Sequence, residues 1–216
     1  MRFQNRSDAG RQLAAQLTAF GHQPDVLILA LPRGGVPVAF EIARTLRAPL
    51  DVWVVRKLGA PDIPELAIGA IATGGIQLLS ADTVHRLHIP PDVIQTIAAR
   101  ERAELDRREK AYRGDRPPIA VAAKTILLVD DGLATGSTMR AAIASLRQRQ
   151  PARIVVAVPV AAHSVCTRLT HEADQIVCLF APLDLNAVGQ WYDDFTQTSD
   201  AEVCDLLHRA REFAPA

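Results

Sequence analysis

The chain has 216 residues, 49% of them hydrophobic, which suits one domain that can bury a sizeable core. Its 24 Lys and Arg residues equal its 24 Asp and Glu residues, so bulk charge gives no reason to expect a nucleic acid or an anionic membrane as a partner. The longest apolar stretch, residues 154–162, is too short to span a bilayer, and the N-terminal residues lack the apolar core of a signal peptide. We therefore expect a single cytoplasmic domain over residues 1–216.

Strands and helices are predicted to alternate along most of the chain. Ser7 is the expected cap of a first helix that runs to about Phe20. Apolar runs bounded by turn residues predict strands, and apolar residues at helical spacing predict helices. This alternation is typical of an α/β fold with a Rossmann-like parallel sheet that helices cover on both faces. The expected strands are 26–31, 50–55, 126–129, 154–160 and 176–180, and the expected later helices are 36–46, 139–148 and 164–172.

Cations follow the first two predicted strands. Because ligands of parallel sheets bind beyond the carboxyl ends of the strands, both segments are candidate binding loops. Arg33, Gly34 and Gly35 combine a forked cation with backbone amides that a ligand can approach closely, which suits phosphate oxygens. Arg56 and Lys57 add two cations after the second strand. The alternatives are an ordinary turn in the first loop and a solvated basic pair in the second.

Residues 58–123 depart from the alternating pattern. Residues 67–80 predict a β-hairpin, and residues 90–113 predict a long charged helix. This helix carries opposite charges at i, i+4, for example Glu104 and Arg108, and each such pair stabilises a helix by about 0.2–0.5 kcal/mol. Because the charges alternate in sign, the pattern favours a solvated face over a nucleic-acid-binding face.

The most informative segment is Thr125–Thr138, which has the sequence TILLVDDGLATGST. A buried strand is predicted to run into two adjacent acids, Asp130 and Asp131, and then into a glycine-rich turn. Hydroxyls at Ser137 and Thr138 mark the start of a helix, where backbone N–H groups are unpaired and the dipole is positive, a ready anion site. The acids would repel an anion, so they indicate a ligand that carries hydroxyls beside its phosphate, such as a ribose 5-phosphate.

The segment Asp130–Thr138 resembles the phosphoribosyl-diphosphate (PRPP) binding motif of type I phosphoribosyltransferases. The resemblance implies that Asp130 and Asp131 hold the ribose hydroxyls and support catalysis. It also implies that Ala134, Thr135, Gly136, Ser137 and Thr138 bind the 5-phosphate, and that Arg33, Gly34, Gly35 and Lys57 bind the diphosphate. The alternative is a strand-to-helix turn of an ordinary Rossmann-like domain, with the acids as solvated turn residues.

The resemblance covers the predicted core and implies a type I phosphoribosyltransferase fold. Residues 58–123 would be the family's mobile flap, enlarged here, and residues 183–216 its small variable hood with a C-terminal helix. Trp191 and Tyr192 in the hood are candidate acceptor-binding residues, although aromatic residues in a closing loop also pack against the domain. Relatives often carry a non-proline cis peptide bond before the basic residue of the pyrophosphate loop. We therefore expect the Pro32–Arg33 bond either to be cis, or to be trans in the empty site and to isomerise when diphosphate binds.

The resemblance further implies an enzyme that transfers the ribose 5-phosphate of PRPP to a nitrogenous acceptor and releases diphosphate. Mg²⁺ is the expected cofactor, bound through substrate oxygens and water with no direct ligand from the chain. The expected partners are PRPP, a small-molecule acceptor and a second copy of the chain in a homodimer. A regulatory protein that binds PRPP or a nucleotide with little or no turnover is the alternative, and an unusual acceptor is also open.

Overall fold

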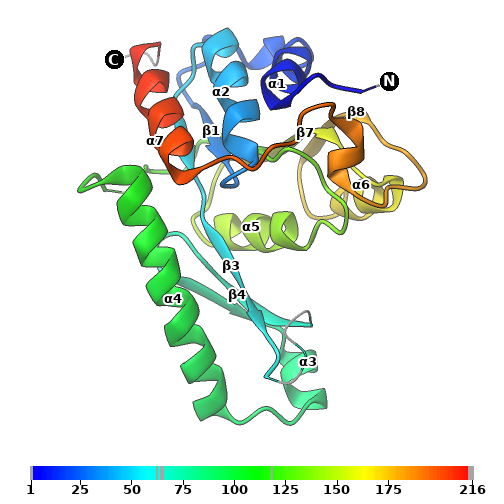
Figure 1. The fold of residues 1–216 in the computed structure, drawn as a ribbon. Coiled ribbons are helices and arrows are strands. Elements are labelled where there is room, and N and C mark those ends of the chain that lie inside the picture. The colour runs from blue at the N-terminus through cyan, green and yellow to red at the C-terminus, as the bar shows by residue number, and fades with distance from the viewer. Residues whose placement is uncertain (1, 62, 64–65, 118, 214–216) are drawn as a thin grey trace.

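A five-stranded parallel sheet forms the body of the protein (Figure 1). The computed structural model describes residues 2–61, 63, 66–117 and 119–213. The strand order is β2-β1-β6-β7-β8, and each strand pairs in parallel with its neighbours, which confirms the predicted α/β fold. The strands are β1 (Val26–Ala30), β2 (Leu50–Val52), β6 (Thr125–Val129), β7 (Arg153–Val160) and β8 (Gln175–Phe180).

Helices cover both faces of this sheet. Val26, Ile28 and Ala30 of β1 pack in one core with α1, α2 and α7, whereas Leu27 and Leu29 pack in another with α5 and α6. Successive side chains of a strand point to opposite faces, so one apolar run supplies both cores. The helices are α1 (Arg6–Ala14), α2 (Gly35–Leu46), α5 (Ser137–Arg147), α6 (His163–Leu169) and α7 (Asp200–Arg209), with short 3₁₀ helices η1 (Thr18–Phe20), η2 (Val188–Trp191) and η3 (Ala210–Glu212).

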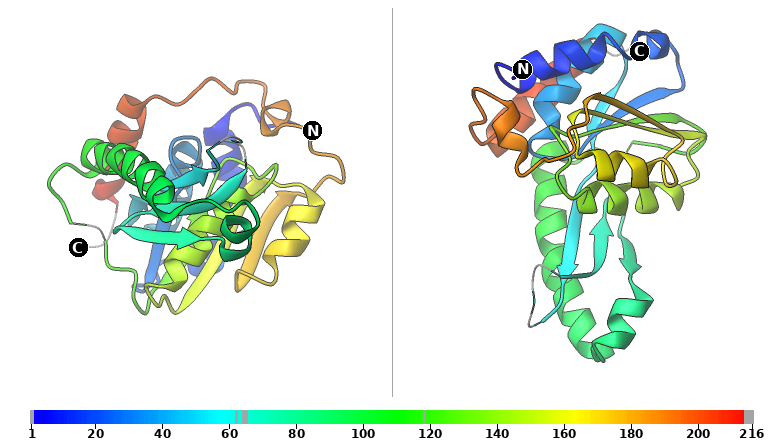
Figure 2. Two further views of the ribbon diagram at one scale, coloured as in Figure 1. Left: turned by 90° about the horizontal axis from the view of Figure 1, so that it is seen from below. Right: turned by 90° about the vertical axis from the view of Figure 1, so that its right-hand side faces the viewer.

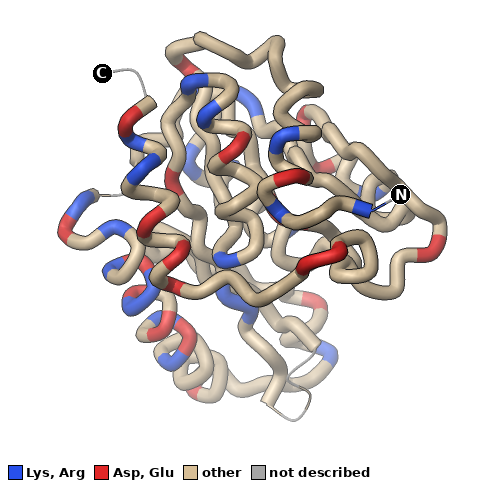
Figure 3. The backbone as a smooth tube through the Cα atoms, turned by 45° about the horizontal axis from the view of Figure 1, so that its top comes forward, with Lys and Arg blue, Asp and Glu red and all other residues tan. Residues whose placement is uncertain are grey.

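A second, antiparallel sheet and a long helix project from the body, and we call this segment, Val55–Arg113, the arm (Figure 2). The predicted hairpin and helix are both present. A further strand, β3, precedes the hairpin and pairs with its first strand. Acidic and basic residues alternate along the helix (Figure 3), where Glu104 and Arg108 form an ion pair at 2.7 Å. The elements of the arm are β3 (Val55–Gly59), β4 (Ala67–Ala72), β5 (Ile76–Leu79), α3 (Ala81–Arg86) and α4 (Pro91–Arg113).

The arm is packed onto the body at its base. Arg113, near the end of α4, donates to the Asp51 carboxylate at 2.9 Å and to the Val52 carbonyl at 2.6 Å. On the other side, Trp53 Nε1 donates to the Ser145 hydroxyl of α5 at 2.9 Å. Motion of the arm as a lid stays a prediction. Parts of the predicted flap and hood, residues 62, 64–65, 118 and 214–216, lie outside the described residues.

The first helix differs from the expectation in its cap and its length. Asn5, not Ser7, is the cap, because its side chain accepts a hydrogen bond from the Asp8 N–H at 2.9 Å. The helix ends at Ala14 instead of running to Phe20, and tighter i→i+3 backbone bonds and η1 follow it. Leu13, Leu17 and Phe20, which are apolar residues at helical spacing, are nevertheless buried. Their spacing therefore indicates burial correctly but not the length of the helix.

The expected strand 50–55 is two strands in two different sheets. β2 ends at Val52, and the buried residues Trp53 and Val54 carry the chain from the body into the arm. The Val54 N–H donates to the Thr73 hydroxyl at 2.9 Å instead of to a strand of the body. The apolar run continues through this crossing, so hydrophobicity alone could not reveal the break. As a result, Lys57 lies within β3 and not in a loop after β2.

Candidate active site

The loops that follow β1 and β6 form neighbouring parts of one site. β1 and β6 are adjacent, with Ala30 paired to Val129, and the Leu31 N–H donates to the Val129 carbonyl at 2.9 Å. The carboxyl ends of these strands therefore present Arg33–Gly35 beside Asp130–Thr138. Ligands of α/β proteins bind at this edge of the sheet.

Two glycines let these loops pack closely. A Cβ atom at Gly34 would overlap the Asp131 carboxylate. One at Gly35 would lie 2.7 Å from the Val129 carbonyl oxygen and 3.0 Å from Asp130 Cα. Gly34 has an ordinary φ of −61°, so this position needs glycine for close approach and not for backbone freedom. The acids and the first loop thus form one packed unit.

The two acids are partly buried, and Asp131 is ion-paired. Arg6 Nε of α1 lies 2.8 Å from Asp131 Oδ2, and the two side chains are only 11% and 14% exposed. Burial, and then the neighbouring charge of Asp131, raise the pKa of Asp130 well above its usual range. Burial also raises the pKa of Asp131, although the Arg6 guanidinium opposes this shift. The alternative that treated the acids as solvated turn residues is therefore wrong.

The turn between the acids and α5 offers exposed donors at a helix start. Gly136 has φ +71° at the cap of α5, and a Cβ there would lie 2.6 Å from Val165 Cγ1, so glycine is required on both grounds. The exposed hydroxyls of Thr135 and Ser137 are 3.2 Å apart. The residues predicted to hold the 5-phosphate, Ala134, Thr135, Gly136, Ser137 and Thr138, all lie in this turn or in the first turn of the 11-residue helix α5.

Arg33 lies at the carboxyl end of β1, next to the start of α7. The Pro32–Arg33 peptide bond is cis, which confirms the sequence-based prediction. Arg33 Nη1 is 3.8 Å from Asp200 Oδ1, and its side chain is 31% exposed. This guanidinium is therefore accessible to a ligand and has a weak carboxylate partner nearby.

Of the two cations in β3, only Lys57 faces the side of α5. Arg56 points toward α4, where its Nη2 lies 2.6 Å from Glu101 Oε2. Neighbouring side chains of a strand point to opposite faces, so Lys57 shares its face with Val55, which packs with the α5 core. Lys57 is exposed, on the face of β3 that contacts α5.

The aromatic residues of the hood mainly close the domain. Tyr192 is 4% exposed, its ring centroid is 5.3 Å from that of Phe3, and its hydroxyl donates to the Asp131 carbonyl at 2.6 Å. Trp191 is half-buried and stacks on Phe180 with centroids 5.6 Å apart. The geometry thus favours the packing alternative for Tyr192 and leaves part of Trp191 accessible.

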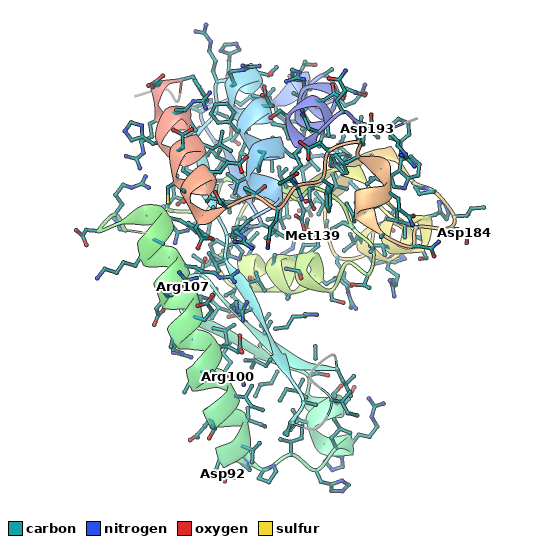
Figure 4. The ribbon with its side chains drawn as sticks, viewed as in Figure 1. Asp92, Arg100, Arg107, Met139, Asp184 and Asp193 are labelled. Atoms are coloured by element: carbon teal, nitrogen blue, oxygen red, sulfur yellow. The ribbon has the colours of Figure 1, made fainter. Side chains whose placement is uncertain are left out.

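Sequence reasoning missed two groups that contact the site. Arg6 is 125 positions from Asp131, and no motif surrounds it. Asp200, near Arg33, also accepts from the Tyr112 hydroxyl of α4 at 2.7 Å. Arg107, labelled on α4 in Figure 4, lies 3.8 Å from the same carboxylate. These contacts depend on tertiary packing, so local patterns carried no signal for them.

Comparison with known proteins agrees with this geometry. A family model described as "Phosphoribosyl transferase domain" matches residues 2–180, which include Arg33–Gly35 and Asp130–Thr138. The chain belongs to the phosphoribosyl transferase family. It shares the α/β fold of that family, with its parallel five-stranded sheet.

Three of the similar proteins match nearly the whole chain. Two proteins named "Putative phosphoribosyl transferase", from Mycobacterium tuberculosis strains CDC 1551 and H37Rv, are each 46% identical over 215 residues, covering 99% of this chain and 48% of their own length. The chain therefore spans about half the length of these relatives. The crystal structure of TT1426 from Thermus thermophilus is 42% identical, with a TM-score of 0.86 and coverage of 100% of both chains.

The described residues alone do not form a metal cage. Within the part of the chain that the structure describes, no cluster of three or more His, Cys, Asp or Glu side chains could hold a metal ion. Asp131 already pairs with Arg6, which leaves few free carboxylate oxygens for a cation. Among the described helices, none combines the length and the apolar character needed to cross a membrane.

Proposed function

We propose that this phosphoribosyl transferase family member transfers the ribose 5-phosphate of PRPP to a nitrogenous acceptor and releases diphosphate, with Mg²⁺ as cofactor. The observation that carries the proposal is the packing of Gly34 directly against the Asp131 carboxylate, beside the start of α5. This arrangement supports one ligand that has vicinal hydroxyls, a phosphate and a second, more highly charged group. PRPP has all three.

Each part of the site has a role in this proposal. Asp130 and Asp131 accept hydrogen bonds from the ribose hydroxyls. Residues 134–138 bind the 5-phosphate through backbone N–H groups and hydroxyls at the positive end of α5. Arg33 and Lys57, with the amides of the Gly34–Gly35 loop, bind the diphosphate as it gains charge.

The proposed reaction is a displacement at C1 of the ribose. The acceptor nitrogen forms a bond to C1 while the C1–O bond breaks and its electron pair leaves with the diphosphate, and the displaced acceptor proton goes to solvent. Positive charge develops on the ribose in the transition state, so nearby carboxylates stabilise it, and fixed positions of both reactants lower the barrier. Mg²⁺, when bound with the substrate, neutralises part of the diphosphate charge.

We further propose that the acceptor enters beside the hood, with Trp191 as the candidate contact. Trp191 is the aromatic residue of the Trp191–Tyr192 pair that keeps exposed surface. We also propose a cytoplasmic homodimer, whose mass light scattering after size exclusion measures directly.

A screen of acceptors tests the proposed function. The wild-type protein is incubated with PRPP, Mg²⁺ and single purine or pyrimidine bases, and diphosphate release is measured with and without a chelator. We expect release with one acceptor class, abolished by chelation and by Asp131→Asn. PRPP binding without release for any acceptor would favour the regulatory alternative. A protein that does not bind PRPP at all would refute both.

A further inference from the structure

Arg6 is held against Asp131 from several sides. Its Nε lies 2.8 Å from Asp131 Oδ2, and its Nη1 donates to the Thr196 carbonyl at 2.8 Å. Its guanidinium carbon lies 3.9 Å from the centre of the Phe195 ring, a cation–π distance. Three contacts of different kinds therefore fix one guanidinium, which explains why its side chain is only 11% exposed.

The N-terminal segment and the hood, which supply these contacts, also hold the backbone of Asp131. The N-terminal segment pairs with the hood, because the Phe3 N–H donates to the Trp191 carbonyl at 2.8 Å and the Asp193 N–H donates to the Phe3 carbonyl at 2.9 Å. Asp193 is labelled on this hood segment in Figure 4. Next to this pairing, the Tyr192 hydroxyl donates to the Asp131 carbonyl at 2.6 Å. The N-terminal segment and the hood thus clamp Asp131 at its side chain and at its backbone.

From this clamp we infer that Arg6 is a positioning residue of the site, which holds the Asp131 carboxylate in place as the acceptor for a ribose hydroxyl. The inference rests on the proposed function of Asp131 in PRPP binding. Arg6 contacts Oδ2, so Oδ1 is the oxygen of this carboxylate that does not carry the Arg6 contact. Arg6 acts through Asp131 and does not itself touch the reacting atoms.

The charges around Asp131 explain why a cation is needed. Among the residues that the structure describes, three titratable groups face it: Arg6 from α1, Asp130 from its own loop and Tyr192 from the hood. Of these three, only Arg6 is positive. Two adjacent carboxylates in a partly buried site favour a shared proton, which would turn an acceptor oxygen into a donor. Arg6 opposes that outcome because it stabilises the ionised form of Asp131.

The first test measures the Asp131 carboxyl group itself, in the ligand-free protein, by carbon NMR titration. Arg6→Gln removes the charge and keeps a polar side chain, Arg6→Lys restores the charge, and Arg11→Gln is the matched control. Arg11 lies on the same helix but pairs with Asp8 and Glu41 at 3.7 Å, away from the site. We expect the titration of Asp131 to move to higher pH in Arg6→Gln and to stay near wild type in the other two. An unchanged titration in Arg6→Gln would overturn the inference.

The second test measures PRPP affinity by calorimetry over a range of pH. We expect Arg6→Gln to bind PRPP on the order of ten-fold more weakly at pH values below the Asp131 titration that the NMR experiment measures, and to recover as the pH rises through it, because Asp131 then ionises without help. Arg6→Lys should remain close to wild type. A merely structural role would not produce this pH-dependent recovery, and melting curves identify any variant that is unfolded.

Three results would contradict the inference in this second test. Tighter binding by Arg6→Gln would mean that Arg6 competes with the ribose, a pH-independent loss would point to packing alone, and equal losses in Arg6→Lys and Arg6→Gln would show that charge is not the cause. If the wild-type protein bound no PRPP, the proposed function would fail. The NMR titration would still decide whether Arg6 controls Asp131.

Discussion

At Gly34, the missing Cβ atom sets the distance between the two ligand loops. We predict that Gly34→Ala strongly weakens PRPP binding, because the added methyl group would overlap the Asp131 carboxylate and displace one of the loops. The overpacking should lower stability by about 1–3 kcal/mol. Gly21→Ala is a matched control, since Gly21 also has a negative φ, −66°, and lies outside the site. Calorimetry with PRPP checks the prediction, which fails if both variants bind like wild type.

At neutral pH, the buried carboxyl group of Asp130 lowers the free energy of unfolding. Its pKa is raised in the folded protein by burial and by Asp131, so its ionised form disfavours folding above the pKa of the unfolded chain. We predict that Asp130→Asn raises the melting temperature at pH 7 by a few degrees, since 1 kcal/mol corresponds to about 2–4 °C in a chain of this size. PRPP binding should be lost at the same time.

The stability difference between Asp130→Asn and the wild-type protein should depend on pH. As the pH falls through the raised pKa of Asp130 toward the ordinary carboxyl range, wild-type Asp130 gains a proton and the advantage of Asp130→Asn should disappear. Asp193→Asn, at an exposed acid of the hood, is the control and should change little. Melting curves from acidic to neutral pH decide the matter, and a variant that is less stable than wild type at pH 7 would refute the prediction.

At the scale of elements, β1 and β3 bring two cations to the proposed diphosphate site. We predict that Arg33→Ala and Lys57→Ala weaken PRPP more than ribose 5-phosphate, which lacks the diphosphate. Both cations retain solvent exposure, so the expected loss is about 1–2 kcal/mol, or roughly 5- to 30-fold. Lys110→Ala, an exposed lysine on α4, is the control. Equal weakening of both ligands would remove Arg33 and Lys57 from the diphosphate site.

Helix α7 places an acidic residue, Asp200, beside Arg33, where it would compete with the diphosphate for the guanidinium group. Asp200 lies 3.8 Å from Arg33 and also accepts from Tyr112 of α4. We predict that Asp200→Asn tightens inorganic diphosphate binding by roughly two- to five-fold, because it removes a negative charge beside Arg33. Asp205→Asn, on the same helix and paired with Arg209, should have no effect. Weaker diphosphate binding by Asp200→Asn in calorimetry would contradict this role.

The elements with strong local signals were predictable from the sequence. The glycine-rich turn and the apolar run before it located β6 and α5. The predicted C-terminal helix is α7, and Ser199 caps it by accepting a hydrogen bond from the Glu202 N–H. The break between β2 and β3 was not predictable, because Trp53 and Val54 are as apolar as the strands they separate. Hydrophobic periodicity reports burial, and these two residues are buried in a crossing between sheets.

For the whole molecule, the sequence located both loops of the candidate site but not the groups that hold them. Asp131 and Gly34 each follow a recognisable strand, whereas their contact across the sheet edge depends on the pairing of β1 with β6. Arg6 and Asp131 lie far apart in the sequence, so no local sequence pattern indicates that they form a pair. The sequence also left open that the acids are solvated turn residues, and only the packed structure shows that burial sets their charge.

The central claim is that the two loops at the ends of β1 and β6 form one site for one ligand. The most direct measurement is calorimetric competition among PRPP, ribose 5-phosphate and inorganic diphosphate in the presence of Mg²⁺. The structure leads us to expect that one PRPP binds per chain, more tightly than either fragment, because it engages the α5 turn and the Arg33 loop together. Each fragment should also be displaced by PRPP. PRPP that binds no more tightly than ribose 5-phosphate, or that leaves bound diphosphate in place, would contradict a single shared site.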